Sequence, residues 1–172
     1  LCFGFMKDNR ELLGRWNTAL TSMRNDFTLA GFEQKYIKNF PENTTYDYIY
    51  GTGRKKKQDI IKFERFSNAP TIRVAVTGDL PPVDFTDDSG FPAGYSTAVL
   101  AEIGRRLHVN IDIVNVSAGA RTAALVSGRA DAVFWYEVNH SLQSQPDVSD
   151  SVILSDPYLS WNTFMHIRKD ED

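Results

Sequence analysis

The chain has 172 residues, of which 42% are hydrophobic and 12% aromatic. This composition is typical of a folded globular protein and excludes an intrinsically disordered chain. The formal net charge of −3 argues against a dedicated nucleic-acid-binding protein, because such proteins usually carry an excess of basic residues.

The single cysteine, Cys2, excludes an internal disulfide framework and a zinc site made of paired thiols. The sequence contains no run of about 18 apolar residues, so it predicts no membrane-spanning helix. It also shows no charged segment followed by an apolar stretch and a cleavage site. The chain begins Leu1-Cys2-Phe3-Gly4 without a methionine, so we expect an internal boundary of a longer protein or a processed end.

The first 40 residues predict a short strand followed by two helices. Residues 1–6 are apolar and aromatic, which favours a strand. Asp8 and Glu11 have the spacing of an N-cap and its partner at the third helical position. A second, shorter helix is predicted over residues 29–37, with Phe32 and Tyr36 on one side. The first helix has apolar residues at steps of three or four on one face: Leu12, Trp16, Leu20, Met23 and Phe27.

Residues 41–70 have the character of a connector, with one short ordered element expected around residues 60–66. The basic run at residues 54–57 is interpreted as a solvated face of this linker, with contact to an anionic surface as the alternative. Residues that interrupt regular structure are spread through the segment: Pro41, Asn43, Gly51, Gly53 and Pro70.

From Thr71 onward, strands and helices alternate. This alternation predicts an α/β fold, with a mostly parallel sheet and helices on both of its faces. Because ligands bind beyond the carboxyl ends of such strands, we expect loops 77–85, 116–121 and 135–139 to meet at one rim. The predicted strands are 71–76, 111–116, 132–135 and 161–167; the predicted helices are 96–107, capped by Ser96, and 121–127, closed by Gly128.

Four segments of the second half of the chain occur in an order that is specific together, although each alone is weakly specific. These are the loop Pro81-Pro82-Val83-Asp84-Phe85, then Asp88-Ser89-Gly90 with Gly94-Tyr95, then residues 124–131, and finally Ser155-Asp156-Pro157-Tyr158. Through these segments, residues 72–156 resemble the first lobe of bacterial extracytoplasmic solute-binding proteins of the polar amino-acid type, the Venus-flytrap or type II periplasmic binding fold.

Residues 1–40 resemble the closing strand and helices of the same family, through Phe3-Gly4-Phe5 and the Lys7–Leu12 segment. The resemblance implies closing elements over 1–40, a linker over 41–70, and the first lobe of a module over 71–172, with no second lobe in the sequence. This order is similar to that of a tandem sensor protein. We therefore expect residues 1–40 to dock on the following sheet, within one chain or swapped between two chains in a dimer.

The resemblance implies an extracytoplasmic protein that binds a small amino-acid-like or amine solute without a cofactor, as a sensing or transport-receptor module of a larger membrane-anchored protein. Its partners would be the solute and a second lobe or neighbouring module. The alternatives are an ABC-transporter substrate receptor without a sensing role and an interaction lobe without a ligand. Because half of the cleft is absent, the chain alone should bind no tighter than roughly millimolar.

No enzyme motif supports a catalytic function. The three histidines, His108, His140 and His166, have no paired carboxylate motif, and the sequence has no nucleophile elbow, phosphate-binding loop or metal-ligand spacing.

In the family that the chain resembles, an arginine after the third strand of the lobe holds the ligand carboxylate. Here no arginine follows Asp131 until Arg168. Glu137 would instead favour a cationic group, and Trp135 and Tyr136 offer aromatic faces. The alternative is that Trp135 packs in the core and Glu137 is solvated.

Three further residues are candidates for the ligand site. Phe85 has the position of an aromatic residue that stacks on the ligand in the family. Asp79 follows the first strand of the lobe and either reaches the rim or caps the loop. Arg121 begins a helix, where a positive charge is unfavourable, so it contacts an anionic ligand or forms a salt bridge.

Overall fold

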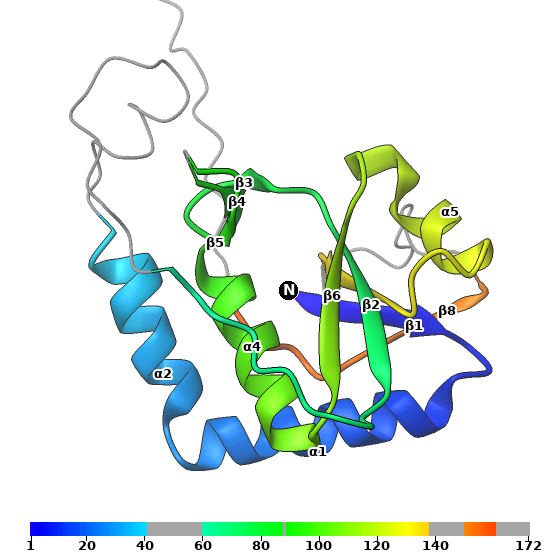
Figure 1. The fold of residues 1–172 in the computed structure, drawn as a ribbon, viewed down its shortest axis with the longest axis horizontal. Coiled ribbons are helices and arrows are strands. Elements are labelled where there is room, and N and C mark those ends of the chain that lie inside the picture. Colours follow the sequence, from blue (N-terminus) through cyan, green and yellow to red (C-terminus); the bar gives the residue numbers. More distant parts are fainter. Residues whose placement is uncertain (41–59, 88, 138–149, 161–172) are drawn as a thin grey trace, which may run out of the picture.

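The computed structural model describes residues 1–40, 60–87, 89–137 and 150–160 (Figure 1). The predicted strand at 161–167, the basic run at 54–57 and residues 138–139 of the third loop lie outside these ranges. No helix in the described part of the chain combines the length and the apolar character needed to cross a membrane.

The centre of the fold is a five-stranded sheet with the strand order β6-β2-β7-β1-β8. Strand β2 pairs in parallel with both β6 and β7, whereas β1 pairs antiparallel with both β7 and β8. The sheet is therefore mixed, but all of its strands except β1 run in the same direction, so its strands are mostly parallel, as predicted. Its strands are β1 (Cys2–Met6), β2 (Thr71–Val76), β6 (Asn110–Asn115), β7 (Ala132–Tyr136) and β8 (Val152–Leu154).

Helices cover both faces of this sheet, which confirms the predicted α/β architecture. Helices α1 (Arg10–Asn25) and α4 (Tyr95–Leu107) pack on one face, and α5 (Arg121–Val126) packs on the other (Figure 1). Strand β2 alternates between the two sides, since Val74 and Val76 belong to the larger apolar cluster and Ala75 to the smaller one.

Residues 1–40 dock on the sheet within the same chain, because β1 lies between β7 and β8. The indole of Trp16 is fully buried and meets the rings of Phe3 and Phe5 edge-on, each at 5.5 Å between centroids. Leu20 and Met23 are also fully buried. The predicted docking is thus confirmed, while the swapped arrangement and the origin of these elements in a solute-binding module stay predictions.

The prediction from the sequence was wrong at both ends of the first helix. Asn9, not Asp8, is the N-cap of α1, and no side chain caps the helix there. Phe27 does not continue the buried face, because the helix ends at Asn25. Phe27 itself adopts φ 64° and is 76% exposed.

The second predicted helix is present as α2 (Thr28–Phe32), which continues as a π-helix over Glu33–Lys38. The rings of Phe32 and Tyr36 meet edge-on at 6.0 Å. Residues 60–66 form neither a helix nor a strand. Their end is nevertheless anchored, because Asn110 accepts a hydrogen bond from the Phe66 amide at 2.8 Å and donates one to its carbonyl at 3.1 Å.

The α4 helix is preceded by Gly94, not by Ser96. Gly94 has φ 99°, and a Cβ there would overlap the carbonyl oxygens of Pro82 and Val83, so the position requires glycine. Ser96 is buried instead, with its Oγ 3.4 Å from Oη of Tyr158. Gly128 ends α5 with φ 69°, as predicted.

Candidate ligand-binding rim

The loops that follow β2, β6 and β7 lie together at the carboxyl edge of the three parallel strands (Figure 1). The Val116 amide donates to the Val76 carbonyl at 2.9 Å, which keeps the ends of β2 and β6 in register. A Cβ placed on Gly78 would lie 3.9 Å from Oδ1 of Asn115. Arg121, in the loop after β6, donates a hydrogen bond to the carbonyl of Trp135 near the end of β7. The three predicted loops therefore meet at one rim.

A β-bulge at the end of β7 directs the aromatic side chains of the rim. In the pairing with β1, Cys2 lies opposite Tyr136 and Gly4 opposite Val133, so β7 carries one extra residue. As a result Trp135 packs toward the cluster under α1 and α4, while Tyr136 packs into the cluster under α5. A Cβ on Gly4 would overlap the Tyr136 ring, so this strand position needs glycine.

Arg121 is the central cation of the rim. Its side chain is only 7% exposed. Its Nε donates to the Ala118 carbonyl at 2.9 Å and its Nη1 to the Trp135 carbonyl at 2.8 Å. The guanidinium carbon lies 3.9 Å from the Trp135 ring centroid and 5.3 Å from that of Tyr136. Within the described residues no carboxylate pairs with Arg121, so the salt bridge considered from the sequence is absent there.

Trp135 packs in the core, which is one of the two roles considered from the sequence, while its role as an aromatic face for a ligand stays a prediction. Its ring packs against the larger apolar cluster and meets Phe134 edge-on at 6.0 Å. The residue as a whole is half-buried, but its Nε1 is fully buried and has no hydrogen-bond acceptor among the described atoms. Tyr136 is buried and shares a hydrogen bond of 2.8 Å with the hydroxyl of Thr122. Glu137, the next residue, is exposed to solvent.

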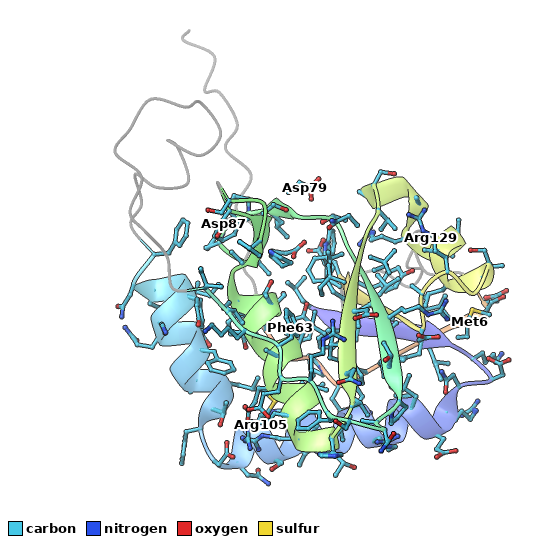
Figure 2. All side chains as sticks on the ribbon, viewed as in Figure 1. Met6, Phe63, Asp79, Asp87, Arg105 and Arg129 are labelled. Atoms are coloured by element: carbon cyan, nitrogen blue, oxygen red, sulfur yellow. The ribbon has the colours of Figure 1, made fainter. Side chains whose placement is uncertain are left out.

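Asp79 and Phe85 form a second group, in a small sheet that the sequence did not predict. The sheet consists of β3 (Asp79–Leu80), β4 (Asp84–Thr86) and β5 (Pro92–Ala93). Asp79 pairs with Phe85 in the register of β3 and β4. Asp79 is exposed, at the top of the coloured ribbon in Figure 2. Phe85 is only 4% exposed, and its ring meets that of Phe40 edge-on at 6.0 Å between centroids.

The carboxylate that caps the loop after β2 belongs to Asp84, a residue that sequence reasoning did not select. Its Oδ2 accepts hydrogen bonds from the Gly78 amide at 2.6 Å and the Thr77 hydroxyl at 3.4 Å. Burial raises the pKa of Asp84 to about 6; the nearby charge of Asp79 adds to this, and the bonds from Gly78 and Thr77 oppose it. The sequence pattern that could have indicated a buried Asp84 is its position between the apolar residues Val83 and Phe85.

Among the described residues the rim thus offers a guanidinium without a carboxylate partner, the half-buried indole of Trp135 and the exposed carboxylate of Glu137. Such groups bind and orient a polar solute. No cluster of three potential metal-ligating side chains occurs in the part of the chain that the structure describes.

Comparison with known proteins places the chain in one family. A family model described as bacterial extracellular solute-binding proteins, family 3, matches residues 72–172. Among solved structures, the L-cystine solute receptor of Neisseria gonorrhoeae in its unliganded open conformation shares 27% identity, with a TM-score of 0.37, over 38% of this chain and 28% of the receptor. The aligned part therefore spans little more than a quarter of that receptor's length. No curated protein matches the chain. The match over more than half of its residues shows that the chain belongs to the bacterial extracellular solute-binding proteins of family 3.

Proposed function

We propose that this chain supplies one lobe of a non-catalytic receptor that binds an amino-acid-like solute outside the cytoplasm. The solute's carboxylate would contact Arg121, and its ammonium group would lie near Glu137. The observation that carries the proposal is the buried guanidinium of Arg121, which has no carboxylate partner among the described residues and lies on the Trp135 ring.

The charge of Arg121 supports an anionic group in the ligand. A buried cation is costly unless it is paired. Two of its nitrogens donate to neutral carbonyl oxygens, which orient the guanidinium without neutralising it. A carboxylate suits the remaining planar N–H donors, because it accepts hydrogen bonds from arginine in a bidentate manner. The Trp135 ring lies against the same guanidinium, and its Nε1 is buried without an acceptor among the described atoms.

The ammonium end of the solute would bind to the residue that follows β7 in the chain. Glu137 is an exposed carboxylate directly after Tyr136, and an ammonium group would complement its charge. An amino acid carries both groups, so one solute could satisfy Arg121 and Glu137 together. Asp79 and Phe85 would then line the neighbouring wall of the site, formed by the small sheet.

We further propose a sensing role, with residues 1–40 as the closing elements of a preceding module, 41–70 as a linker and 71–172 as a first lobe. Support comes from the order of the segments, since elements that resemble the end of a module precede those that resemble its start. A transport receptor without sensing is the alternative. The sequence beyond Asp172 discriminates: a second lobe, a membrane span and a signalling domain favour a membrane-anchored sensor.

The test follows the indole N–H signals by ¹H–¹⁵N NMR while each of the twenty amino acids is added. We expect at least one to shift the Trp135 signal in a saturable way, with a dissociation constant of roughly millimolar or weaker, because a single lobe buries only part of the ligand. Trp16 is the internal control: its Nε1 is also unpartnered, but it lies in the core and should not respond.

The matched variants are Arg121→Gln and Arg129→Gln. The first should abolish the Trp135 response. The second should leave it unchanged, because Arg129 is exposed in the segment between α5 and β7, near α5 in Figure 2. The proposal is wrong if no amino acid shifts the Trp135 signal at 20 mM, a concentration roughly twentyfold above millimolar affinity, or if Arg121→Gln responds like the wild type.

A further inference from the structure

The hydroxyl groups of Tyr136 and Thr122 form a pair at the rim that the proposed ligand contacts do not use. Tyr136 is 1% exposed, and its Oη lies 2.8 Å from Oγ1 of Thr122. Neither hydroxyl has a second hydrogen-bond partner among the described residues. Removal of one hydroxyl would leave the other without a partner there, so the pair is a specific link between β7 and α5.

Two consecutive residues of α5 bond two consecutive residues of β7 at this point. Arg121 donates from its Nη1 to the Trp135 carbonyl at 2.8 Å, and Thr122 shares its hydroxyl bond with Tyr136. The rest of this six-residue helix is held by apolar packing in the smaller cluster. Among the described residues, the polar bonds between α5 and β7 thus come from the turn that carries Arg121.

Strand β1 holds the Tyr136 ring from the side opposite α5. A Cβ on Gly4 would overlap Cδ2 and Cε2 of this ring, so the ring lies directly against the β1 backbone. The ring also belongs to the apolar cluster under α5, together with Val133 and Val152. In such close packing it has little freedom to turn, and its hydroxyl stays directed at Thr122.

We propose that Tyr136 is a positioning residue of the ligand-binding rim: its hydroxyl holds the first turn of α5 and thereby fixes the guanidinium of Arg121 on the Trp135 ring. The guanidinium carbon lies 3.9 Å from the centroid of that ring, a placement that depends on where the helix begins. The importance of this placement for binding rests on the function proposed above. The hold on Arg121 itself is measurable without any ligand.

A guanidinium that is already fixed binds a solute more tightly than a mobile one, because the side chain loses less conformational freedom on binding. The bonds from Arg121 to the Ala118 and Trp135 carbonyls select one rotamer only while α5 stays in register with β7. The Thr122–Tyr136 pair supplies that register, because it lies one residue further along both elements.

The experiment measures hydrogen exchange of the Arg121 Nε–H group by ¹H–¹⁵N NMR of the 172-residue chain. In the wild type this proton donates to the Ala118 carbonyl at 2.9 Å and should be protected. Tyr136→Phe keeps the ring and removes the hydroxyl, so the proton should exchange on the order of fivefold faster, the effect of one net hydrogen bond. The Nε–H of Arg106 is the internal control, because it donates to Glu102 within α4 at 2.6 Å and should not change.

Variants of Thr122 test the link from the helix side. Thr122→Val removes the hydroxyl at nearly constant shape and should match Tyr136→Phe, whereas Thr122→Ser keeps the hydroxyl and should exchange like the wild type. The double variant of Tyr136→Phe with Thr122→Val should be no faster than either single variant, because both remove the same bond. Tyr36→Phe is the matched control, because it removes a tyrosine hydroxyl from the π-helix beside α4 and should leave Arg121 unaffected.

The amino-acid titration of the Trp135 signal measures the consequence for binding. For an amino acid that binds the wild type, Tyr136→Phe should raise the dissociation constant roughly threefold, because Arg121 must then be ordered on binding. Thr122→Ser and Tyr36→Phe should bind like the wild type. An unchanged dissociation constant in a Tyr136→Phe protein whose Arg121 proton exchanges faster would overturn the role in binding.

Unchanged exchange of the Arg121 proton in both Tyr136→Phe and Thr122→Val overturns the inference. An equal rise at Arg106 also overturns it, since the whole chain would then have loosened, and so does a wild-type Arg121 proton that exchanges too fast to observe. If Tyr136→Phe does not fold, the comparison of Thr122→Val with Thr122→Ser decides. If Arg121 responds as expected while no amino acid shifts the Trp135 signal, the receptor proposal fails and the hold of Tyr136 on Arg121 stands.

Discussion

Replacement of Trp16 by alanine tests whether residues 1–40 are part of one core with the sheet. The side chain is fully buried between Phe3 and Phe5. Burial of an aromatic side chain of about 200 Å² contributes about 5 kcal/mol at about 25 cal/mol per Å², and measured losses for such truncations are about 3–5 kcal/mol. Because the unpartnered Nε1 costs about 1–3 kcal/mol in the folded state, we expect a net loss of about 3 kcal/mol.

The assay is urea unfolding at 25 °C, followed by far-ultraviolet circular dichroism. The control is Phe27→Ala, because Phe27 is 76% exposed in the same region of the chain and should change the free energy of unfolding by less than about 0.5 kcal/mol. Domains of this kind are stable by only about 5–15 kcal/mol, so the loss at Trp16 is easily measured. A Trp16→Ala protein as stable as Phe27→Ala would refute the docking of residues 1–40.

Two further predictions concern the rim. Gly4→Ala should lower the free energy of unfolding by about 1–3 kcal/mol, because the added methyl group overlaps the Tyr136 ring. The NMR signals of Tyr136 should shift for the same reason. Unchanged Tyr136 signals would contradict the bulge geometry. Asp84 has a pKa of about 6 when folded, against an ordinary value of 3.8, so the folded protein binds its proton more tightly and Asp84 destabilises the fold as pH rises from about 4 to 6. Relative to Asp84→Asn, the wild type should lose about 2 kcal/mol between pH 4 and pH 7 in urea unfolding. A difference independent of pH would argue against a buried carboxylate.

The spacing of apolar residues predicted the main helices and strands, because each element must bury one face and its apolar residues therefore recur with the period of that element. The steps between Leu12, Trp16, Leu20 and Met23 place them on one helical face, and that face is the buried one. The prediction failed at Phe27 because no glycine or proline marks the end of α1 in the sequence.

The site was predictable in outline but not in detail. The alternation of strands and helices placed the loops after β2, β6 and β7 at one edge, and that edge holds Arg121, Trp135 and Tyr136. The bulge in β7 could not be foreseen, since it depends on the register with β1, a strand far away in the sequence. Asp84 was missed for a similar reason: its donors are backbone and hydroxyl groups brought together by the loop.

The position of β1 between β7 and β8 has a consequence for the way the chain folds. The Phe3 amide donates to the side chain of Ser155, 152 positions away along the chain, so one end of the sheet is completed by two distant parts of the chain. Contacts between such remote residues are slow to form, because a long loop must close first. Until β1 arrives, β7 presents an open edge that can pair with the same strand of another molecule. Slow refolding at high protein concentration would therefore favour exchange of this strand between two copies.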